Sequence, residues 1–354
     1  MANDRIGARL ISVVGVGSVR AKSYLDLHRE MSAEIEAERH SALELLGPSA
    51  ESVRASVAEL LEHRTFAYPL SVLPVIVHAV ETGTTGPAVP LAVVHDLWWT
   101  SACYLDDLAD GQAVLAAGGL GESEALLATV IGGIPLPLLV VQSPRIPEAA
   151  RGPLSAEIVK CWINATEGQL RDLRADLGAA TRDAVVAAYL GKSGAPYSMV
   201  TAMAAQLAGR PHDRVELWRE FGNVFGILWQ LFNDQQDILT GRDEDLVNGT
   251  VTYLLACALE AADPGSAARV LELHAAARTS SDARAALTDI LLAPDVLRRY
   301  EKDINGFRDG AHRLLDMLGG DAAHLALLHD LVDRASPMLL QAAEPLARAV
   351  PAPH

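Results

Sequence analysis

Two clusters of acidic residues, 127 positions apart, hold the side chains of this chain that are best suited to chemistry. The first runs from Asp106 to Asp110 with the sequence DDLAD, and the second from Asn233 to Asp237 with the sequence NDQQD. Oxygen ligands at positions i and i+4 of a helix lie on one face, a single turn apart. Such ligands suit Mg²⁺, which binds through a few carboxylates together with substrate phosphates. Two clusters that face each other would therefore hold a diphosphate through metal ions.

A pair of solvated acidic helix faces is the alternative interpretation of these clusters. Both clusters follow strongly apolar segments, which contain Trp98 and Trp99 in one case and Phe225, Trp229 and Phe232 in the other. Carboxylates on a buried face are costly unless something neutralises them, and like charges at i and i+4 destabilise a helix by about 0.2–0.5 kcal/mol per pair. The apolar surroundings therefore favour a metal site.

The overall charge of the 354-residue chain is strongly acidic, with a net charge of −16 and a pI near 5.1. This balance argues against nucleic acid and against an anionic membrane surface as partners. An acidic protein that handles a diphosphate must attract it through metal ions. Lysine is scarce, so a lysine near a motif is informative; the lysines are Lys22, Lys160, Lys192 and Lys302.

The cysteines and the apolar segments indicate a cytoplasmic protein. The cysteines show no paired spacing and are expected to be small core residues in a reducing compartment; they are Cys103, Cys161 and Cys257. The most apolar run, residues 125–141, is interrupted by two prolines and is short for a spanning helix. The apolar stretch 10–19 lacks an A-x-A-like cleavage site. We therefore expect neither a membrane span nor a signal peptide.

Helical periodicity dominates the chain, with almost no strand-like alternation. We expect an all-α fold in which residues 21–350 form a single domain after a flexible segment 1–20. Breaks at glycine and proline delimit the predicted helices: 22–46, 50–63, 66–82, 88–110, 122–141, 154–176, 181–207, 213–239, 250–261, 265–277, 281–292, 295–318 and 322–347. Both acidic clusters fall near the ends of long helices and precede glycine-containing loops, which could close over a ligand.

Five segments, taken in order, resemble the trans-polyprenyl diphosphate synthase family over residues 60 to 260. Besides the first acidic cluster, they are a GQxxDL segment from Gly168 to Leu173, the pair Lys192-Ser193 at an expected helix kink, the second motif from Gly222 to Asp237, and the segment from Asp245 to Thr252. One acidic motif alone is weak evidence of kinship, whereas five ordered segments predict both the fold and the site.

The resemblance implies a helical bundle with a deep central cavity, a homodimer, and an allylic prenyl diphosphate as substrate. Three Mg²⁺ ions would bridge the two clusters to the diphosphate. The metal ligands would be Asp106, Asp110, Asn233 and Asp237, supported by Asp107 and Asp234. The residues expected to contact diphosphate or substrate are Lys192, Gln230, Gln169, Asp172 and Arg242.

The chain departs from the family where the second substrate of chain elongation, isopentenyl diphosphate, would bind. The family carries GGKRxRP in an early helix, but residues 63–69 read HRTFAYP, so that Thr65, Phe66 and Tyr68 replace one lysine and two arginines. Trp99 stands where the family has a histidine, and residues 111–121 contain no basic residue. Each lost charge-assisted hydrogen bond is worth about 1.5–3 kcal/mol. We therefore expect isopentenyl diphosphate not to be a substrate.

The replacing residues are aromatic, and aromatic faces stabilise cations by about 2 kcal/mol or more when desolvated. Phe66, Tyr68, Trp98 and Trp99 are thus predicted to line the pocket of a folding carbocation, although they could simply fill the vacated space. Ala102 and its neighbour Ser101 are small and would leave the channel open, with Trp98 as the floor. A C15 or C20 chain is expected.

Four functions are compatible with these residues. The preferred one is a Mg²⁺-dependent terpene cyclase that ionises an allylic diphosphate and quenches the cation internally or with water. The second is a prenyltransferase with another acceptor, such as a peptide tryptophan or an aromatic molecule. The third is ordinary chain elongation with a remodelled site. The fourth, of a different class, is a non-catalytic subunit that regulates a prenyl synthase.

Overall fold

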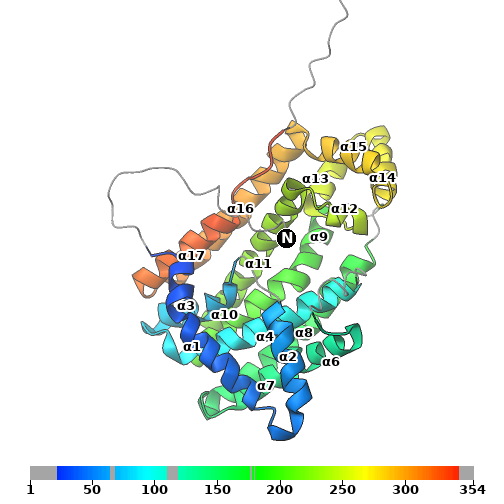
Figure 1. The fold of residues 1–354 in the computed structure, drawn as a ribbon. Coiled ribbons are helices and arrows are strands. Elements are labelled where there is room, and N and C mark those ends of the chain that lie inside the picture. The colour runs from blue at the N-terminus through cyan, green and yellow to red at the C-terminus, as the bar shows by residue number, and fades with distance from the viewer. Residues whose placement is uncertain (1–21, 64–67, 110–118, 176–177, 179, 343–354) are drawn as a thin grey trace, which may run out of the picture.

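The computed structural model describes residues 22–63, 68–109, 119–175, 178 and 180–342. These residues form helices joined by short loops and contain no β-strand (Figure 1). The predicted all-α fold is confirmed. The buried apolar side chains of these helices form one contiguous hydrophobic cluster.

The helices have the following bounds: α1 Tyr24–Glu44, α2 Glu51–His63, α3 Leu73–Thr82, α4 Val89–Ala109, α6 Glu122–Gly133, α7 Pro135–Gln142, α8 Glu148–Leu173, α9 Arg182–Tyr189, α10 Ala195–Leu207, α11 His212–Thr240, α12 Glu244–Asn248, α13 Tyr253–Ala261, α14 Pro264–Ala277, α15 Ser281–Leu291, α16 Pro294–Leu318 and α17 Ala322–Ala335. A π-helical segment, η5, spans Leu190–Gly194, and short 3₁₀ turns span Pro48–Ala50, Leu70–Val72 and Gly86–Ala88.

Helix α10 lies at the centre of the bundle. Its residues from Ala195 to Ala205 are all buried, as expected of a helix that is apolar on every side. It packs against α11, α8, α3 and α4. Figure 1 shows α14 and α15, in yellow, at the end of the bundle remote from α1, α2 and α7. The long helices α4, α8 and α11 thus have a common rigid neighbour that holds them in place.

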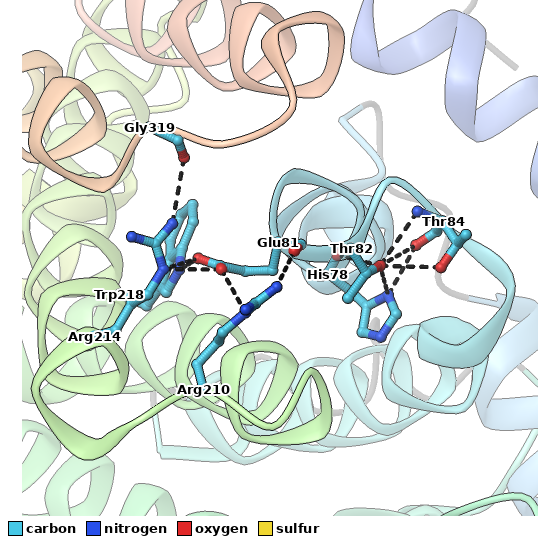
Figure 2. A network of polar contacts seen from close by, with 8 residues as sticks. All are labelled: His78, Glu81, Thr82, Thr84, Arg210, Arg214, Trp218 and Gly319. Atoms are coloured by element: carbon cyan, nitrogen blue, oxygen red, sulfur yellow. Dashed lines mark hydrogen bonds and ion pairs between the residues drawn. The ribbon is translucent and has the colours of Figure 1, made fainter.

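A buried carboxylate ties three parts of the bundle together (Figure 2). The side chain of Glu81 on α3 is only 2 % exposed. It accepts hydrogen bonds from Arg214 Nε, at 2.7 and 2.8 Å, and from Trp218 Nε1, at 2.5 Å. Arg210 Nε forms an ion pair with it at 2.8 Å, and Arg214 also donates to the carbonyl of Gly319, which follows α16. This network satisfies a charge that would otherwise be costly to bury.

Several predicted helix boundaries were wrong. Helix α8 begins at Glu148 rather than at residue 154, because it accommodates Pro153 in its interior. The predicted helix 181–207 is interrupted by the π segment η5, and the predicted helix 322–347 ends earlier, at Ala335. Periodicity locates an apolar face well, but helix ends depend on local contacts that it does not report.

One helical stretch among the described residues, Glu122–Gln142, is long and apolar enough by length and composition to cross a membrane. This stretch corresponds to the predicted helix 122–141, which contains the apolar run 125–141. Half of its apolar window is buried inside the protein, and the backbone departs from helical geometry at Ile134, between α6 and α7. A buried core helix meets the same criterion.

We predict that His95, in the core part of α4, makes the protein acid-sensitive. Burial lowers the pKa of His95 to about 4, and neither ring nitrogen has a hydrogen-bond partner among the described residues. In the unfolded chain the imidazole of His95 takes up a proton near pH 6.5, whereas in the folded protein it does so only near pH 4. The free energy of unfolding therefore falls as the pH drops from 6.5 to 4, and His95 accounts for about 3 kcal/mol of this loss. Urea unfolding at several pH values measures the slope.

In this experiment His95→Phe, which keeps a ring beside Trp99 and Tyr197, should show a shallower loss of stability below pH 6.5. His212→Phe is the matched control, because the side chain of His212 is largely exposed. Identical pH slopes for wild type and His95→Phe would contradict the prediction.

Candidate functional site

A cavity of about 580 Å³ opens between α4, α8, η5, α11, the short helix α12 and the residues that flank α12. Its mouth is polar and its base is apolar. The polar lining residues include Asp106, Asp107, Gln169, Asp172, Lys192, Ser193, Gln230, Asn233, Asp234, Asp237, Arg242, Asp245 and Asn248. The structure therefore brings together the two acidic clusters and the Gly168 and Lys192 segments. Asp110 lies outside the described residues.

Asp106, near the end of α4, is already contacted by two neighbouring elements. Its Oδ1 atom accepts a hydrogen bond from Gln169 Nε2 on α8 at 2.7 Å and lies 3.2 Å from Lys192 Nζ. Lys192 also lies 3.2 Å from Asp172 Oδ2 on α8. A single ammonium group thus bridges carboxylates from two helices, α4 and α8.

The ammonium of Lys192 is held charged. Burial by itself would lower the pKa of this lysine, but the adjacent carboxylates of Asp106 and Asp172 raise it above its ordinary value. A permanently charged donor at the mouth is suited to binding an anion. To reach a diphosphate it would exchange one of these carboxylates for a phosphate oxygen.

The π segment η5 places Lys192 because it is clamped between two helices at backbone contact. A Cβ atom at Gly168 of α8 would lie 2.5 Å from the Lys192 nitrogen, and one at Gly191 would lie 2.5 Å from the Gly168 Cα. On the other side, a Cβ at Gly226 of α11 would lie 2.4 Å from the Ser193 carbonyl oxygen. Only glycine permits this approach, and π segments are frequent at functional sites.

On α11, Asp234 is buried within a hydrogen-bonded chain. Its oxygens accept bonds from Tyr189 OH at 2.5 Å and from Gln230 Nε2 at 2.9 Å, while Ser193 Oγ donates to Gln230 Oε1 at 2.6 Å. Burial raises the pKa of Asp234 to about 6, although the bonds from Tyr189 and Gln230 act in the opposite direction. This chain links α11 to α9 and η5.

Asp237, one turn further along α11, holds the start of the next helix, α12. Its two oxygens accept hydrogen bonds from the backbone amides of Glu244 and Asp245, each at 3.2 Å, and Arg242 Nε lies 3.7 Å away. Burial raises the pKa of Asp245, and the nearby carboxylates of Asp234 and Asp237 raise it further. Helix α12 thereby adds a third carboxylate, that of Asp245, to the second cluster.

The mouth carries more negative charge than its own cations neutralise. Among the described lining residues, the basic side chains are Lys192 and Arg242, against seven acidic ones. No group of three or more His, Cys, Asp or Glu side chains in the described part of the chain is placed to hold a metal ion by itself. This arrangement of oxygen ligands fits Mg²⁺, which retains waters and is completed by substrate phosphates.

The base of the cavity is aromatic. Trp98, Trp99 and Ala102 on α4 line it, as does Trp162 on α8. Tyr68 does not belong to the lining: its ring, 43 % exposed, packs edge-on against Trp229 and Phe232 at 5.5 and 5.6 Å. Phe66 lies outside the described residues. The predicted aromatic wall is thus present on α4 but is not continued by Tyr68.

Sequence reasoning did not assign Trp162 or Tyr189 to the site, and it named Asp245 only as the start of the fifth segment. For Trp162 a signal existed, because Trp162, Ala165, Thr166 and Gln169 follow the i, i+3, i+4, i+7 spacing of one helix face and all of them line the cavity. Tyr189 and Asp245 reach the site from other elements, so no spacing within α11 would have revealed them.

Comparison with known proteins agrees with this architecture. Residues 149–291 match the family model described as polyprenyl synthetase. No curated protein sequence matches the chain. The segment that matches includes the Gly168 and Lys192 segments and the second acidic cluster, but not the first.

Solved structures with the same fold cover most of the chain. A polyprenyl synthase from Caulobacter crescentus, complexed with calcium and isoprenyl diphosphate, is 16 % identical, with a TM-score of 0.74 over 90 % of this chain and 99 % of that one. A decaprenyl diphosphate synthase from Rhodobacter capsulatus is 21 % identical, with a TM-score of 0.72 over 88 % and 97 %. A geranylgeranyl pyrophosphate synthase from Corynebacterium glutamicum, complexed with isoprenyl diphosphate and magnesium, is 17 % identical, with a TM-score of 0.71 over 87 % and 99 %.

These findings confirm the resemblance seen in the sequence. Residues 149–291 are similar to the polyprenyl synthetase family, and the all-α fold is that of the isoprenyl synthases. The match over residues 149–291 indicates an enzyme of the isoprenoid synthase class with prenyl diphosphate chemistry.

We predict that Gly168→Ala destabilises the protein by about 3 kcal/mol, because the new methyl group would overlap the backbone at Lys192. Gly152→Ala is the matched control on the same helix. Nothing lies within 4 Å of its new Cβ, so alanine should be neutral or stabilise by about 0.5–1 kcal/mol. Urea unfolding measures both. Equal effects of the two substitutions would show that the backbone contact at Gly168 is not tight.

Proposed function

We propose that this protein ionises an allylic prenyl diphosphate in a Mg²⁺-dependent reaction and directs the resulting cation to cyclise, releasing diphosphate. The observation that carries the proposal is the division of the cavity into a carboxylate-rich mouth with one charged lysine and an aromatic base. A leaving diphosphate fits the first part and an apolar chain with a transient positive charge fits the second.

The oxygen ligands at the mouth suit the metal. Asp106 on one side and Asn233 and Asp237 on the other would hold it, with Asp110 as a further ligand and with Asp107 and Asp234 supporting them. When bound, Mg²⁺ would supply Lewis-acid neutralisation of the leaving diphosphate. The excess of carboxylates over cations at the mouth supports this assignment, because it requires added positive charge.

The protein's own groups would bind and orient the substrate. Lys192 donates to the diphosphate after leaving Asp106 or Asp172, both 3.2 Å away in the structure. Gln230, positioned by Ser193 and Asp234, lies beside the reacting end of the chain. The indoles of Trp98 and Trp99 exclude water from the cation and face it with their π-systems.

The small number of basic side chains in the cavity favours cyclisation over ordinary chain elongation. Among the described residues that line the cavity, Lys192 and Arg242 are the basic ones, and both belong to the mouth that serves the first diphosphate. Transfer to another acceptor, such as a peptide tryptophan or an aromatic molecule, would use the same residues and differ only in what quenches the cation. A purely regulatory subunit would have no use for the paired carboxylate clusters.

The test is incubation of the purified protein and Mg²⁺ with geranyl, farnesyl and geranylgeranyl diphosphate, each with and without isopentenyl diphosphate. We expect diphosphate release and cyclic hydrocarbons or alcohols without isopentenyl diphosphate. Asp106→Ala should reduce the rate about a hundredfold or more, and removal of Mg²⁺ with a chelator should abolish it. Gas chromatography with mass spectrometry and a diphosphate assay provide the readouts.

Glu167→Ala, which removes an exposed carboxylate of α8 paired with Arg171, is the matched control and should leave the rate unchanged. If longer linear diphosphates form, and only when isopentenyl diphosphate is present, the protein catalyses chain elongation and not cyclisation. Absence of turnover without an added aromatic or peptide acceptor, and turnover with one, would favour the transferase.

We also propose that the protein is a homodimer that buries the face formed by α6, α7 and α8. Half of the exposed large apolar side chains in the described residues lie there, and a concentration of this kind marks an interaction surface. They are Leu126, Leu127, Val130, Ile134, Leu139, Val159 and Ile163. A symmetric dimer would cover the same face on both copies.

The double substitution Leu127→Asp and Ile163→Asp should convert the dimer into a monomer, because both side chains are more than 60 % exposed on this face. Light scattering coupled to size-exclusion chromatography measures the mass. Met317→Asp, at an equally exposed apolar residue on α16, is the control. A wild-type monomer, or a dimer that persists in the double variant, would refute the proposed interface.

A further inference from the structure

At its base the cavity ends on two tryptophans from different helices. The ring centroids of Trp98 on α4 and Trp162 on α8 are 4.9 Å apart, with the ring planes at 44°. No lining residue on either helix precedes them. At 1.5 Å per residue, Trp98 lies about 12 Å below Asp106 and Trp162 about 10 Å below Gln169. The two indoles therefore form the floor.

Trp162 is held in place by a specific contact with the end of α6. Its Nε1–H group donates a hydrogen bond to the carbonyl of Gly133 at 2.7 Å, and a Cβ atom at Gly133 would lie 2.7 Å from its Cζ2 atom. The indole thus lies directly against the glycine backbone. The Nε1–H group of Trp98 has no partner among the described residues, so the bond from Trp162 is the polar contact that secures the floor.

The residues around this contact are small. A Cβ at Gly132 or Gly133 would lie 3.1 Å from Ser101 atoms, so α6 meets α4 and α8 through backbone and a serine. Loss of the Trp162 indole would leave an unfilled space between these three helices, because a close-packed interior relaxes only partly. That space would continue the cavity downward.

We propose that Trp162 sets the longest prenyl chain that the cavity accepts. This inference rests on the proposed function and names the residue that limits its substrate. A prenyl chain longer than the distance from the mouth to the indoles must fold back against Trp98 and Trp99. In a variant without the floor, the same prenyl chain would extend toward Gly133. Trp162 is a specificity-determining residue, and Gly133 positions it.

The test measures binding rather than turnover. Prenyl thiolodiphosphates of 10, 15, 20 and 25 carbons, which ionise slowly, are titrated by calorimetry into the wild type and four variants in the presence of Mg²⁺. In Trp162→Ala, the chain length at which affinity collapses should rise by at least one five-carbon unit, with a tenfold or greater gain for the first length that the wild type rejects. Trp162→Phe, which keeps a ring in the floor, should retain the wild-type limit.

Gly133→Ala gives an independent test in the opposite direction. Its methyl group pushes the indole into the cavity, so the limit should fall to a shorter chain. Lys160→Ala, at an exposed position of the same helix α8, controls for unspecific effects and should leave the profile unchanged. If Trp162→Ala does not fold, the shift in Gly133→Ala decides the question.

Two results would overturn the inference, and they are distinguishable. If the wild type binds these analogues and neither Trp162→Ala nor Gly133→Ala changes the length profile, Trp162 is not the limit although the proposed function stands. If the wild type binds none of the analogues, the proposed function fails, and the inference fails with it.

Discussion

The direct backbone contact of α8, η5 and α11 is the constraint on which the site depends. Gly168 meets Gly191 on one side of the π segment and Gly226 meets Ser193 on the other, at separations that leave no room for a Cβ atom. The two long helices thereby approach each other closely enough for Lys192 to reach Asp106 and Asp172. A regular helix through residues 190–194 would turn this lysine to a different angle, because each residue rotates the side chain by about 100°.

Charge and packing divide the cavity into two environments. At the mouth, carboxylates from α4, α8, α11 and α12 crowd together, and burial and mutual repulsion raise the pKa values of Asp234 and Asp245. At the base, the walls are indole and methyl groups. The mouth is thus complementary to cations and, through them, to phosphates, while the base is complementary to an apolar chain. The residues of the Glu81 network do not line the cavity, and their hydrogen bonds join α3 to α11 in the scaffold.

Much of this organisation was predictable from the sequence, because it depends on spacing within single helices. The i and i+4 positions of the acidic clusters place their oxygens on one face, and Trp98, Ala102 and Asp106 share a face of α4 for the same reason. The predicted position of Tyr68 in the pocket was not borne out, since its ring rests on Trp229 and Phe232. Alignment to a family motif indicates where a residue falls along the chain, whereas the direction of an aromatic ring depends on its packing partners.

The all-α class, the two carboxylate faces and the apolar core can be inferred from the amino-acid sequence, because periodicity and composition encode which face of a helix is buried. Which of these faces meet is seen in the folded structure. It brings Trp162 against Trp98 from two helices, places Tyr189 against Asp234, and directs the backbone amides at the start of α12 to the oxygens of Asp237. These contacts join residues 7 to 64 positions apart along the chain, and no pattern within one helix reports them.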